Sequence, residues 1–400
     1  PGSLDVLTAH PGVHFIRAPN YGVTAAVEPE GLDTVGLQTW RDFGFRGQGA
    51  KIAVADLGFD GHRSLVGSEL PRSFITRSFR SDGDFSGAGN PHGTAAAEVV
   101  NDIAPDATMY LVNFLTEVEM GTAVDWLISE GVDVISSSVG WPGSSYGDGA
   151  GTVNEIIRRA ERAGVVWVQA AGNYGNTHWT GMFNDPDGNG FQNFSGNDEG
   201  NTIFLRRGRP AEERVFRIEV FLTWDDWDTF RQDYDLFLFQ GDRVVAQSTA
   251  FQNGQFPPIE HIVYTSATQG DYWIAVQRFR SNRRVRLDFA VTIDYNLEYQ
   301  VPAESLVPPA DSRDAITVGA VHPDTLNLRP YSSQGPTKDG RTKPDLVAPD
   351  QVSTATYGPG GFTGTSASAP YVGGVAALIR GARPGMPSAI VRSMLLQRAT

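Results

Sequence analysis

The strongest constraint in this sequence is a regular alternation of short apolar runs with helical segments. Residues 51–56 (KIAVAD) form an apolar run that ends just before Gly58, and residues 93–103 (GTAAAEVVNDI) form an Ala-rich stretch that Pro105 stops. The alternation continues with expected strands at 109–114, 133–138 and 165–171 and expected helices at 122–130 and 153–163. This pattern predicts an α/β fold, a doubly wound parallel sheet with helices on both faces.

An all-β block interrupts this alternation. Between about residues 203 and 299 the apolar segments are short and rich in β-branched and aromatic residues, which is typical of an antiparallel sandwich. The α/β pattern then resumes, with an expected strand at 315–321 and expected helices at 368–380 and 387–398. A chain that leaves one pattern and returns to it carries a domain inserted in a loop. We therefore expect an N-terminal extension that packs on an α/β domain, and an inserted all-β sandwich domain, with the ranges 1–46, 47–184 plus 301–400, and 185–300.

Composition and charge exclude several classes of protein. The chain has 32 Lys and Arg against 46 Asp and Glu, a net charge of −14, which argues against nucleic acid or an anionic membrane surface as its main partner. It has no Cys, which excludes disulfides, thiolate metal sites and a Cys nucleophile. No apolar run is long enough to predict a membrane span, and the opening residues PGSLDVLTAHPG do not resemble a signal peptide.

Three short segments carry residues suited to nucleophilic catalysis. Asp56 ends the first expected strand, His92 opens the first Ala-rich helix, and Ser366 lies at the start of a later helix. Open α/β sheets place their sites at the carboxyl ends of strands, so these side chains can converge. Each residue alone is equally well explained as a strand-end Asp, a helix cap or a Gly/Ser-rich turn.

The chemistry of these residue types fits together. A Ser hydroxyl becomes a good nucleophile when an imidazole takes its proton, and a carboxylate orients the imidazole. The backbone N–H of Ser366 at a helix N-terminus can stabilise an oxyanion, and the amide of Asn173, just past a strand end, can supply a second donor.

In these motifs the sequence resembles the subtilase (subtilisin-like) family of serine peptidases. The segments HGT, AAGN and GTSASAP carry the resemblance in the family's order Asp, His, Ser, and the aspartate segment IAVADLG departs from the family by Leu57 where Ser or Thr is usual. The resemblance covers roughly residues 40–184 and 301–400. It implies that Asp56 orients, that His92 is the general base and acid, that Ser366 is the nucleophile and that Asn173 is the oxyanion donor.

The resemblance also implies an activity and its partners. The chain is expected to be a serine endopeptidase that hydrolyses polypeptides through an acyl-enzyme and needs no cofactor. An upstream inhibitory propeptide and a secreted or cell-surface location follow from the family. Two alternatives remain: a catalytically silent secreted binding protein that uses the insert, and a processing peptidase of narrow specificity.

Substrate-binding residues carry over from the same resemblance. One edge of the cleft is expected to pair with the peptide, and a second segment is expected to floor the first specificity pocket: Ser138, Val139 and Gly140 for the edge, and Ala170, Ala171 and Gly172 for the pocket. The opposite wall departs from the family, because residues 115–121 (LTEVEMG) replace a Gly/Ser-rich stretch. Glu117 and Glu119 in that segment favour a basic substrate residue.

The inserted block resembles the small β-sandwich domains, called pre-peptidase C-terminal domains, that follow many secreted bacterial peptidase domains. The segments LTWDD, DYDLFL and GDYWIAV carry this resemblance. Such a domain near the cleft can screen access or bind substrate chains. Its aromatic residues alternate along the strands and are expected to form the core: Trp224, Trp227, Phe230, Phe237, Phe239 and Trp273.

Two acidic segments are candidate structural Ca²⁺ sites. Asp185, Asp187 and Asn189 match the first half of a D-x-D-x-N-G calcium loop, although the bidentate Glu expected later is replaced by Gly196. A second acidic run either holds calcium or forms a solvated sandwich edge: Asp225, Asp226, Asp228, Asp233 and Asp235. The His residues outside the motifs have no partners at metal-ligand spacing and are read as surface or loop residues: His62, His178, His261 and His322.

Overall fold

A parallel sheet of seven strands forms the first unit of the computed structural model, which describes residues 30–31, 36–205, 216–254, 256–266, 270–291 and 295–399. The strand order is β16-β15-β5-β4-β1-β3-β2, and every neighbouring pair is parallel. The strands are β1 (Lys51–Asp56), β2 (Ile75–Ser78), β3 (Thr108–Asn113), β4 (Val134–Ser137), β5 (Val166–Ala170), β15 (Ala315–Val321) and β16 (Leu346–Pro349). The chain passes from β1 to β2 and β3 on one side and then crosses to β4 on the other side of β1, so the carboxyl end of β1 lies at the switch point where α/β sheets bind ligands.

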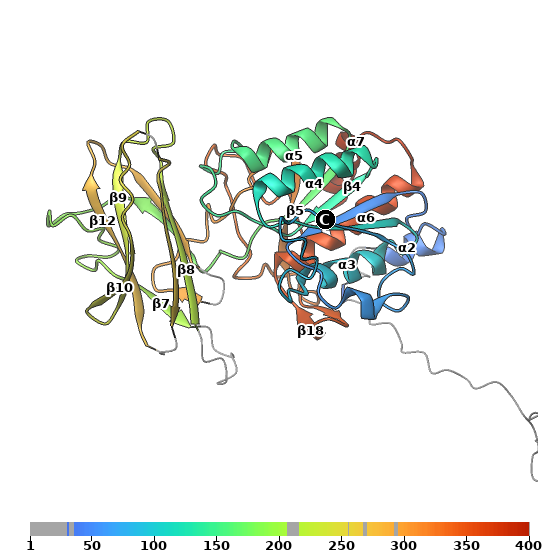
Figure 1. Ribbon diagram of the computed structural model, residues 1–400, viewed down its shortest axis with the longest axis horizontal. Helices are drawn as coiled ribbons and strands as arrows, with labels where there is room; N and C mark the ends of the chain where they lie inside the picture. The colour runs from blue at the N-terminus through green and yellow to red at the C-terminus, as the bar shows by residue number, and fades with distance from the viewer. Residues whose placement is uncertain are drawn as a thin grey trace, which may run out of the picture.

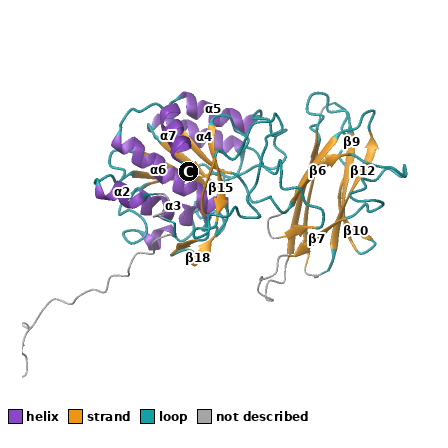
Figure 2. Ribbon diagram, turned by 180° about the vertical axis from the view of Figure 1, so that it is seen from behind, coloured by secondary structure: helices purple, strands orange, loops and turns teal. Residues whose placement is uncertain are grey.

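Helices cover both faces of this sheet, as Figures 1 and 2 show. One apolar core joins the sheet to α3 and α6, and a second core joins its other face to α4 and α5. The helices are α2 (Leu37–Asp42), α3 (His92–Ile103), α4 (Glu117–Ser129), α5 (Thr152–Arg162), α6 (Thr365–Ala382) and α7 (Ser388–Arg398), with a short 3₁₀ turn at His62–Leu65. The prediction of a doubly wound α/β fold is confirmed.

The second unit consists of two antiparallel sheets that share one apolar core. Their strand orders are β10-β9-β12-β7-β14 and β11-β8-β13-β6. The strands are β6 (His178–Met182), β7 (Asn201–Leu205), β8 (Phe216–Trp224), β9 (Asp233–Gln240), β10 (Arg243–Ser248), β11 (Ile259–Ser266), β12 (Tyr272–Arg280), β13 (Arg286–Val291) and β14 (Tyr295–Leu297). Leu222 of β8 and Leu236 of β9 lie in the shared core, so the sheets pack face to face. We refer to this unit, residues 178–297, as the inserted β domain.

The inserted β domain differs from the sequence prediction in two respects. It begins at β6, so the boundary at residue 185 was placed too late, because the HWTGM segment pairs with β13, more than a hundred residues further on. Of the aromatic residues expected in the core, Trp224 is buried there, but Phe239 and Trp273 are only half-buried and stack on each other, 3.9 Å between ring centroids. They lie on the opposite face of their strands from the core residues Leu238 and Ile274.

The two connections into the inserted β domain run side by side. The Asn176 side chain donates to Asn296 (2.8 Å), and the Val301 N–H donates to the His178 carbonyl (2.8 Å). β5 and β15 are therefore neighbours in the parallel sheet although the insert separates them in the sequence. Figure 1 shows the yellow strands of the insert beside the α/β unit.

A charge network around the buried Lys338 side chain holds the inserted β domain to the α/β unit. Lys338, in a loop of the α/β unit, donates to Asp288 of β13 and to Glu304 (2.9 Å), and Glu304 also accepts from Arg286 (3.1 Å). Burial disfavours the charged carboxylate, but the positive charge of Lys338 and the contact with His178 outweigh it, so the pKa of Asp288 lies far below its usual range. His178, expected at the surface, is buried and contacts Asp288 (3.2 Å).

The described part of the N-terminal extension contacts the α/β unit. The Glu30 carboxylate accepts the Ser353 N–H (2.6 Å), its carbonyl accepts from Tyr371, and Leu37 lies in the core beside α6. Most of the extension predicted at residues 1–46 lies outside the described residues. Within the part of the chain that the structure describes, no helix has both the length and the apolar character for a bilayer crossing.

We predict that Lys338→Met lowers the free energy of unfolding by about 1–3 kcal/mol, because it removes the cation between the half-buried carboxylates of Asp288 and Glu304 and leaves them with His178 and Arg286 alone. The Lys338 side chain is 9% exposed, whereas the ion pair of Arg46 with Asp106 is 46% and 40% exposed. The control Arg46→Gln is expected to lose only about 0–1 kcal/mol. Denaturant unfolding followed by Trp fluorescence measures both, and equal losses would contradict the role of the buried network.

Candidate active site

Asp56 and His92 are brought together by a strand end and a helix start. Asp56 is the last residue of β1 and is almost fully buried, and His92 is the first residue of α3. Asp56 Oδ2 lies 2.8 Å from His92 Nδ1, and Oδ1 accepts the Leu57 N–H (2.7 Å). Gly93 permits this approach, because a Cβ there would lie 2.8 Å from the Asp56 Cβ and 2.6 Å from the Gly58 carbonyl oxygen.

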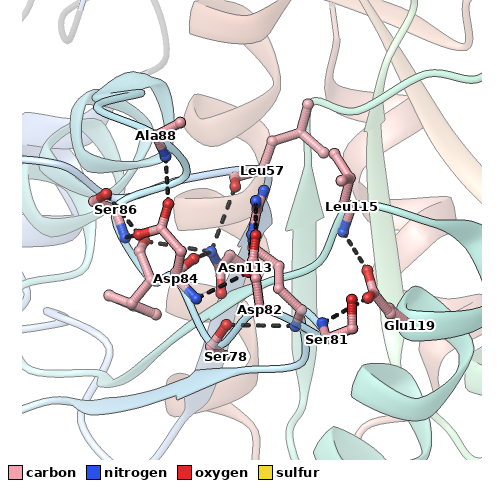
Figure 3. A network of polar contacts seen from close by, with 12 residues as sticks. Leu57, Ser78, Ser81, Asp82, Asp84, Ser86, Ala88, Asn113, Leu115 and Glu119 are labelled. Atoms are coloured by element: carbon pink, nitrogen blue, oxygen red, sulfur yellow. Dashed lines mark hydrogen bonds and ion pairs between the residues drawn. The ribbon is translucent and has the colours of Figure 1, made fainter.

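The loop before His92 is fixed by a polar network at the ends of β1 and β3, which Figure 3 shows. The Asn113 amide donates to the carbonyls of Asp84 (2.8 Å) and Leu57 (3.4 Å). The Asp84 carboxylate in turn accepts the backbone N–H groups of Ser86 (2.9 Å) and Ala88. Although the family's usual Ser or Thr is replaced by Leu57, backbone contacts hold this position.

The charge state of His92 is set by two opposing effects. Burial disfavours the imidazolium, but the negative charge of Asp56 and its hydrogen bond favour it more strongly, so the pKa of His92 lies above its ordinary value. The same contact fixes the proton of the neutral ring on Nδ1, which leaves Nε2 free to accept a proton.

Ser366 lies at the N-terminus of α6, beside the N-terminus of α3. At the start of α3 the His92 ring contacts Phe362, just before α6 (5.5 Å between ring centroids), and at the end of α3 Ile103 packs against Gly374. The two helices therefore run in the same direction. Ser366 is the second residue of α6, and its carbonyl accepts from the Ser138 hydroxyl (3.2 Å). The sequence analysis started this helix at 368, one turn too late.

Asn173 is anchored to the same helix start. Its Oδ1 accepts the Thr365 N–H (2.9 Å), and the Thr365 hydroxyl accepts the Gly172 N–H (3.0 Å). This orientation leaves the Nδ2 hydrogens available to a ligand. Gly364 has φ of 97°, and a Cβ there would lie 2.7 Å from Asn173 Nδ2, so only Gly fits beside the amide.

A pocket opens next to Ser366. It is lined by residues from the predicted edge and floor, namely Ser138, Val139, Gly140, Ala170, Gly172 and Asn173, and by Gln169, Tyr174, Val307, Thr365 and Ser366. The predicted residue Ala171 does not line it, because it is fully buried and its N–H donates to Val318 (2.9 Å). Val307 was missed by the sequence analysis, since it comes from the segment after the insert, where no local motif marks it.

A helix begins early in the segment that was expected to form the opposite wall of the cleft. α4 begins at Glu117, because Thr116 and Glu119 form a capping box that starts it five residues before the predicted position. The Glu119 carboxylate accepts the backbone N–H groups of Ser81 and Leu115 (2.8 Å each), as Figure 3 shows. The Glu119 carboxylate is therefore occupied by backbone N–H groups of the loop and of the helix start. Of the two acidic residues predicted to contact a basic substrate group, only Glu117 keeps that prediction.

The predicted calcium loop is closed by an Arg. Asp185 Oδ2 accepts from Arg278 (2.9 Å) and from the Gly190 N–H (3.1 Å), and the Asn189 amide donates to Asp187 (3.1 Å). Among the described residues, no group of three or more acidic or His side chains is arranged to hold a metal. A Ca²⁺ at this loop stays a prediction.

Taken together, a parallel α/β sheet carries an Asp at a strand end, a His at a helix start and a Ser at a later helix start, in that chain order. This chain order is the one that the resemblance to subtilases implies.

Comparison with known proteins places the chain in a family. The sequence profile of the Subtilase family matches residues 47–197 and 294–400, so the chain belongs to the subtilase family, a family of serine peptidases. The chain is similar to subtilisin E of Bacillus subtilis, 26% identical over 173 residues that cover 40% of this chain and 43% of the relative. It is also similar to a thermostable alkaline protease of Halalkalibacterium halodurans, 27% identical over 187 residues that cover 43% and 49%.

The aligned segment spans less than half the length of the two relatives. Among solved structures, the CspB protease of Clostridium perfringens matches with a TM-score of 0.57 and 17% identity, covering 86% of this chain and 84% of that one. At this identity the likeness shows a common fold.

Proposed function

We propose that the chain is a serine endopeptidase that uses Asp56, His92 and Ser366. The observation that supports this best is the contact between Asp56 and His92 (2.8 Å) at the switch point of the sheet, where the N-terminus of the Ser366 helix also lies. Membership of the subtilase family supports the same assignment.

The residues divide the reaction between them. Ser366 Oγ attacks the scissile carbonyl while His92 Nε2 takes its proton, and Asp56 holds the ring and stabilises the imidazolium. The Ser366 N–H at the helix N-terminus and Asn173 Nδ2 stabilise the oxyanion. His92 then protonates the leaving amine, and water hydrolyses the acyl-enzyme by the same proton path. The proposed chemistry uses these groups and water alone.

The substrate binds as an extended peptide. Residues 138–140 present a strand edge for main-chain pairing, and the pocket beside Ser366 takes the side chain before the scissile bond. The short opposite wall and the inserted β domain favour a narrow range of substrates. The loop that follows the edge packs on the insert, since a Cβ on Gly143 would lie 2.5 Å from Ile259. Secretion and an inhibitory propeptide stay predictions.

A fluorophosphonate is expected to label Ser366 in the native protein and not after denaturation, because only the folded site activates the hydroxyl. Peptide mass spectrometry locates the adduct. Ser366→Ala is expected to abolish both labelling and peptide hydrolysis. Ser368→Ala, on the same helix with a buried hydroxyl that has no hydrogen-bond partner among the described residues, is the matched control. Labelling that persists in Ser366→Ala would refute the assignment, and no labelling of the parent would favour a silent binding protein.

The acid limb of the kcat/KM profile reports the proton on His92. The general base must be neutral, so activity falls as the pH drops through a pKa that Asp56 raises above its ordinary value. Asp56→Asn removes the negative charge that raises the pKa of His92, so the acid limb moves to lower pH. The plateau value of kcat/KM is expected to fall by about 10⁴-fold. Asp82→Asn, an exposed acid in the loop before His92, is the control that leaves the limb in place. An unmoved limb in Asp56→Asn would contradict the pairing.

Gly364→Ala tests the position of the Asn173 amide. Asn173→Ala is expected to reduce kcat by about 10²–10³-fold through loss of one oxyanion donor. Gly364→Ala places a methyl group against that amide and is expected to approach the same loss. Gly358→Ala is the matched control, since it has a similar φ of 79° but open space around its Cβ. Steady-state kinetics on one peptide compares the three variants, and equal losses for the two Gly variants would show backbone strain alone.

A further inference from the structure

Two buried acidic residues lie on the outer side of the inserted β domain. Asp233 and Asp235 of β9 alternate with Tyr234 and Leu236, which point into the core. The two carboxylates therefore face away from the core, yet Asp233 is 0% and Asp235 is 7% exposed. They are not the solvated edge that the sequence alternative described.

The loop between β10 and β11 lies over these carboxylates. Arg280 of β12, the register partner of Asp233, donates to the Gln252 carbonyl (2.8 Å), and its guanidinium lies 4.7 Å from the centre of the Phe251 ring. The Gly254 N–H donates to the Phe230 carbonyl (2.7 Å). These contacts hold residues 251–254 against the start of β9.

Several side-chain oxygen atoms beneath this loop have no hydrogen-bond partner among the described residues. Both carboxylate oxygens of Asp233 and Oε1 of Gln252 are buried and lack a hydrogen-bond partner among the described residues. Gln252 is itself fully buried. Buried acceptors without a partner are rare in native proteins, because each forfeits its hydration. Acceptor oxygens of two neighbouring side chains in such a place are suited to a ligand with positive charge.

Glu260 fixes the orientation of Gln252. Its Oε1 accepts from Gln252 Nε2 (3.1 Å) and from the Ala250 N–H (2.8 Å), and its Oε2 accepts from the Ser248 hydroxyl. Because the amide nitrogen of Gln252 is held by Glu260, the amide oxygen is the atom left over. Glu260 acts here as a positioning residue with both of its own oxygens satisfied.

The charges in this cluster do not balance. Asp233, Asp235 and Glu260 carry −3 when ionised, and Arg280 supplies +1, which leaves −2. A divalent cation would neutralise the cluster.

We propose that Asp233, Asp235 and the Gln252 amide oxygen bind a Ca²⁺ ion in the inserted β domain. The ligands are all oxygens of mixed type, which suits Ca²⁺ and not a softer metal, and water completes the coordination. Two carboxylates and one amide make up the protein ligands. This site is distinct from the Asp185 loop and does not depend on the peptidase assignment.

The ion would order the part of the insert that packs on the loop after residues 138–140. It ties β9 to the loop that leads into β11, whose first residue is Ile259. Ile259 is the residue that packs on Gly143, in the loop that follows the substrate edge. Glu260, the neighbour of Ile259, belongs to the cluster.

The experiment titrates CaCl₂ into the chelator-stripped full chain by calorimetry, in a Ser366→Ala background that prevents self-cleavage. The expected result is a binding event that Asp233→Asn removes and that Gln252→Ala weakens at least tenfold. Asp187→Asn, in the Asp185 loop, is the matched control and keeps the event. MgCl₂ is expected to bind at least tenfold more weakly. No Ca²⁺ binding, binding that survives Asp233→Asn, loss in Asp187→Asn, or equal affinity for Mg²⁺ would each overturn the proposal.

Thermal unfolding separates an ion site from a merely structural role for Asp233. In chelator, Asp233→Asn is expected to unfold at or above the temperature of the parent, because an amide replaces an uncompensated buried charge. With free Ca²⁺ at 100 times its Kd, the parent is expected to gain about 5 °C and the variant nothing. A variant that is less stable in chelator and gains as much from Ca²⁺ as the parent would overturn the proposal.

Discussion

The candidate site depends on the close packing of α3 and α6 on one face of the parallel sheet. Both helices are rich in Ala and Gly, and the spacing is tight: a Cβ on Gly374 would lie 2.7 Å from the Ile103 Cβ, and one on Gly373 would lie 2.9 Å from the Ser136 Cβ. Larger side chains would move α6 away from both α3 and β4. Because the two helices start at the same edge of the sheet, their first turns bring His92 and Ser366 to the end of β1, where Asp56 is fixed.

The inserted β domain is joined to this site through shared structure. Val307 follows the insert, lines the pocket beside Ser366, and lies within 3.0 Å of where a Cβ on Gly140 would be. The next residue, Pro308, accepts the Trp141 N–H (2.7 Å). One short segment therefore forms a wall of the pocket and a contact with the substrate edge. A displacement of the insert would reach the pocket through this segment and the buried charges around Lys338.

Sequence periodicity was sufficient for most of the fold, because apolar runs and helix stops are local signals. The strands around Asp56, the Ala-rich helices and the insertion were predicted in this way, and the three motifs named Asp56, His92 and Ser366. The early start of α4 required a capping contact between Thr116 and Glu119. The burial of His178 and the closure of the Asp185 loop by Arg278 rest on partners about a hundred residues away, which periodicity does not report.

Burial alone does not distinguish Asp233 from other acidic residues of this chain. The Glu98 carboxylate is equally buried but accepts the backbone N–H groups of Ala355 and Thr356, and Asp311 accepts the Gly149 N–H (2.7 Å). Asp226, in the same acidic run as Asp233, accepts the Gln232 N–H (2.8 Å), and these bonds outweigh burial so that its pKa is lowered. Asp226 and Asp233 belong to the same acidic run, and the sequence pattern does not distinguish them. Only the fold shows that backbone N–H groups of its own turn stabilise the charge of Asp226, whereas Asp233 lies under a loop that carries the unpaired amide oxygen of Gln252. That difference is why the proposed cation is placed at Asp233 and not at Asp226.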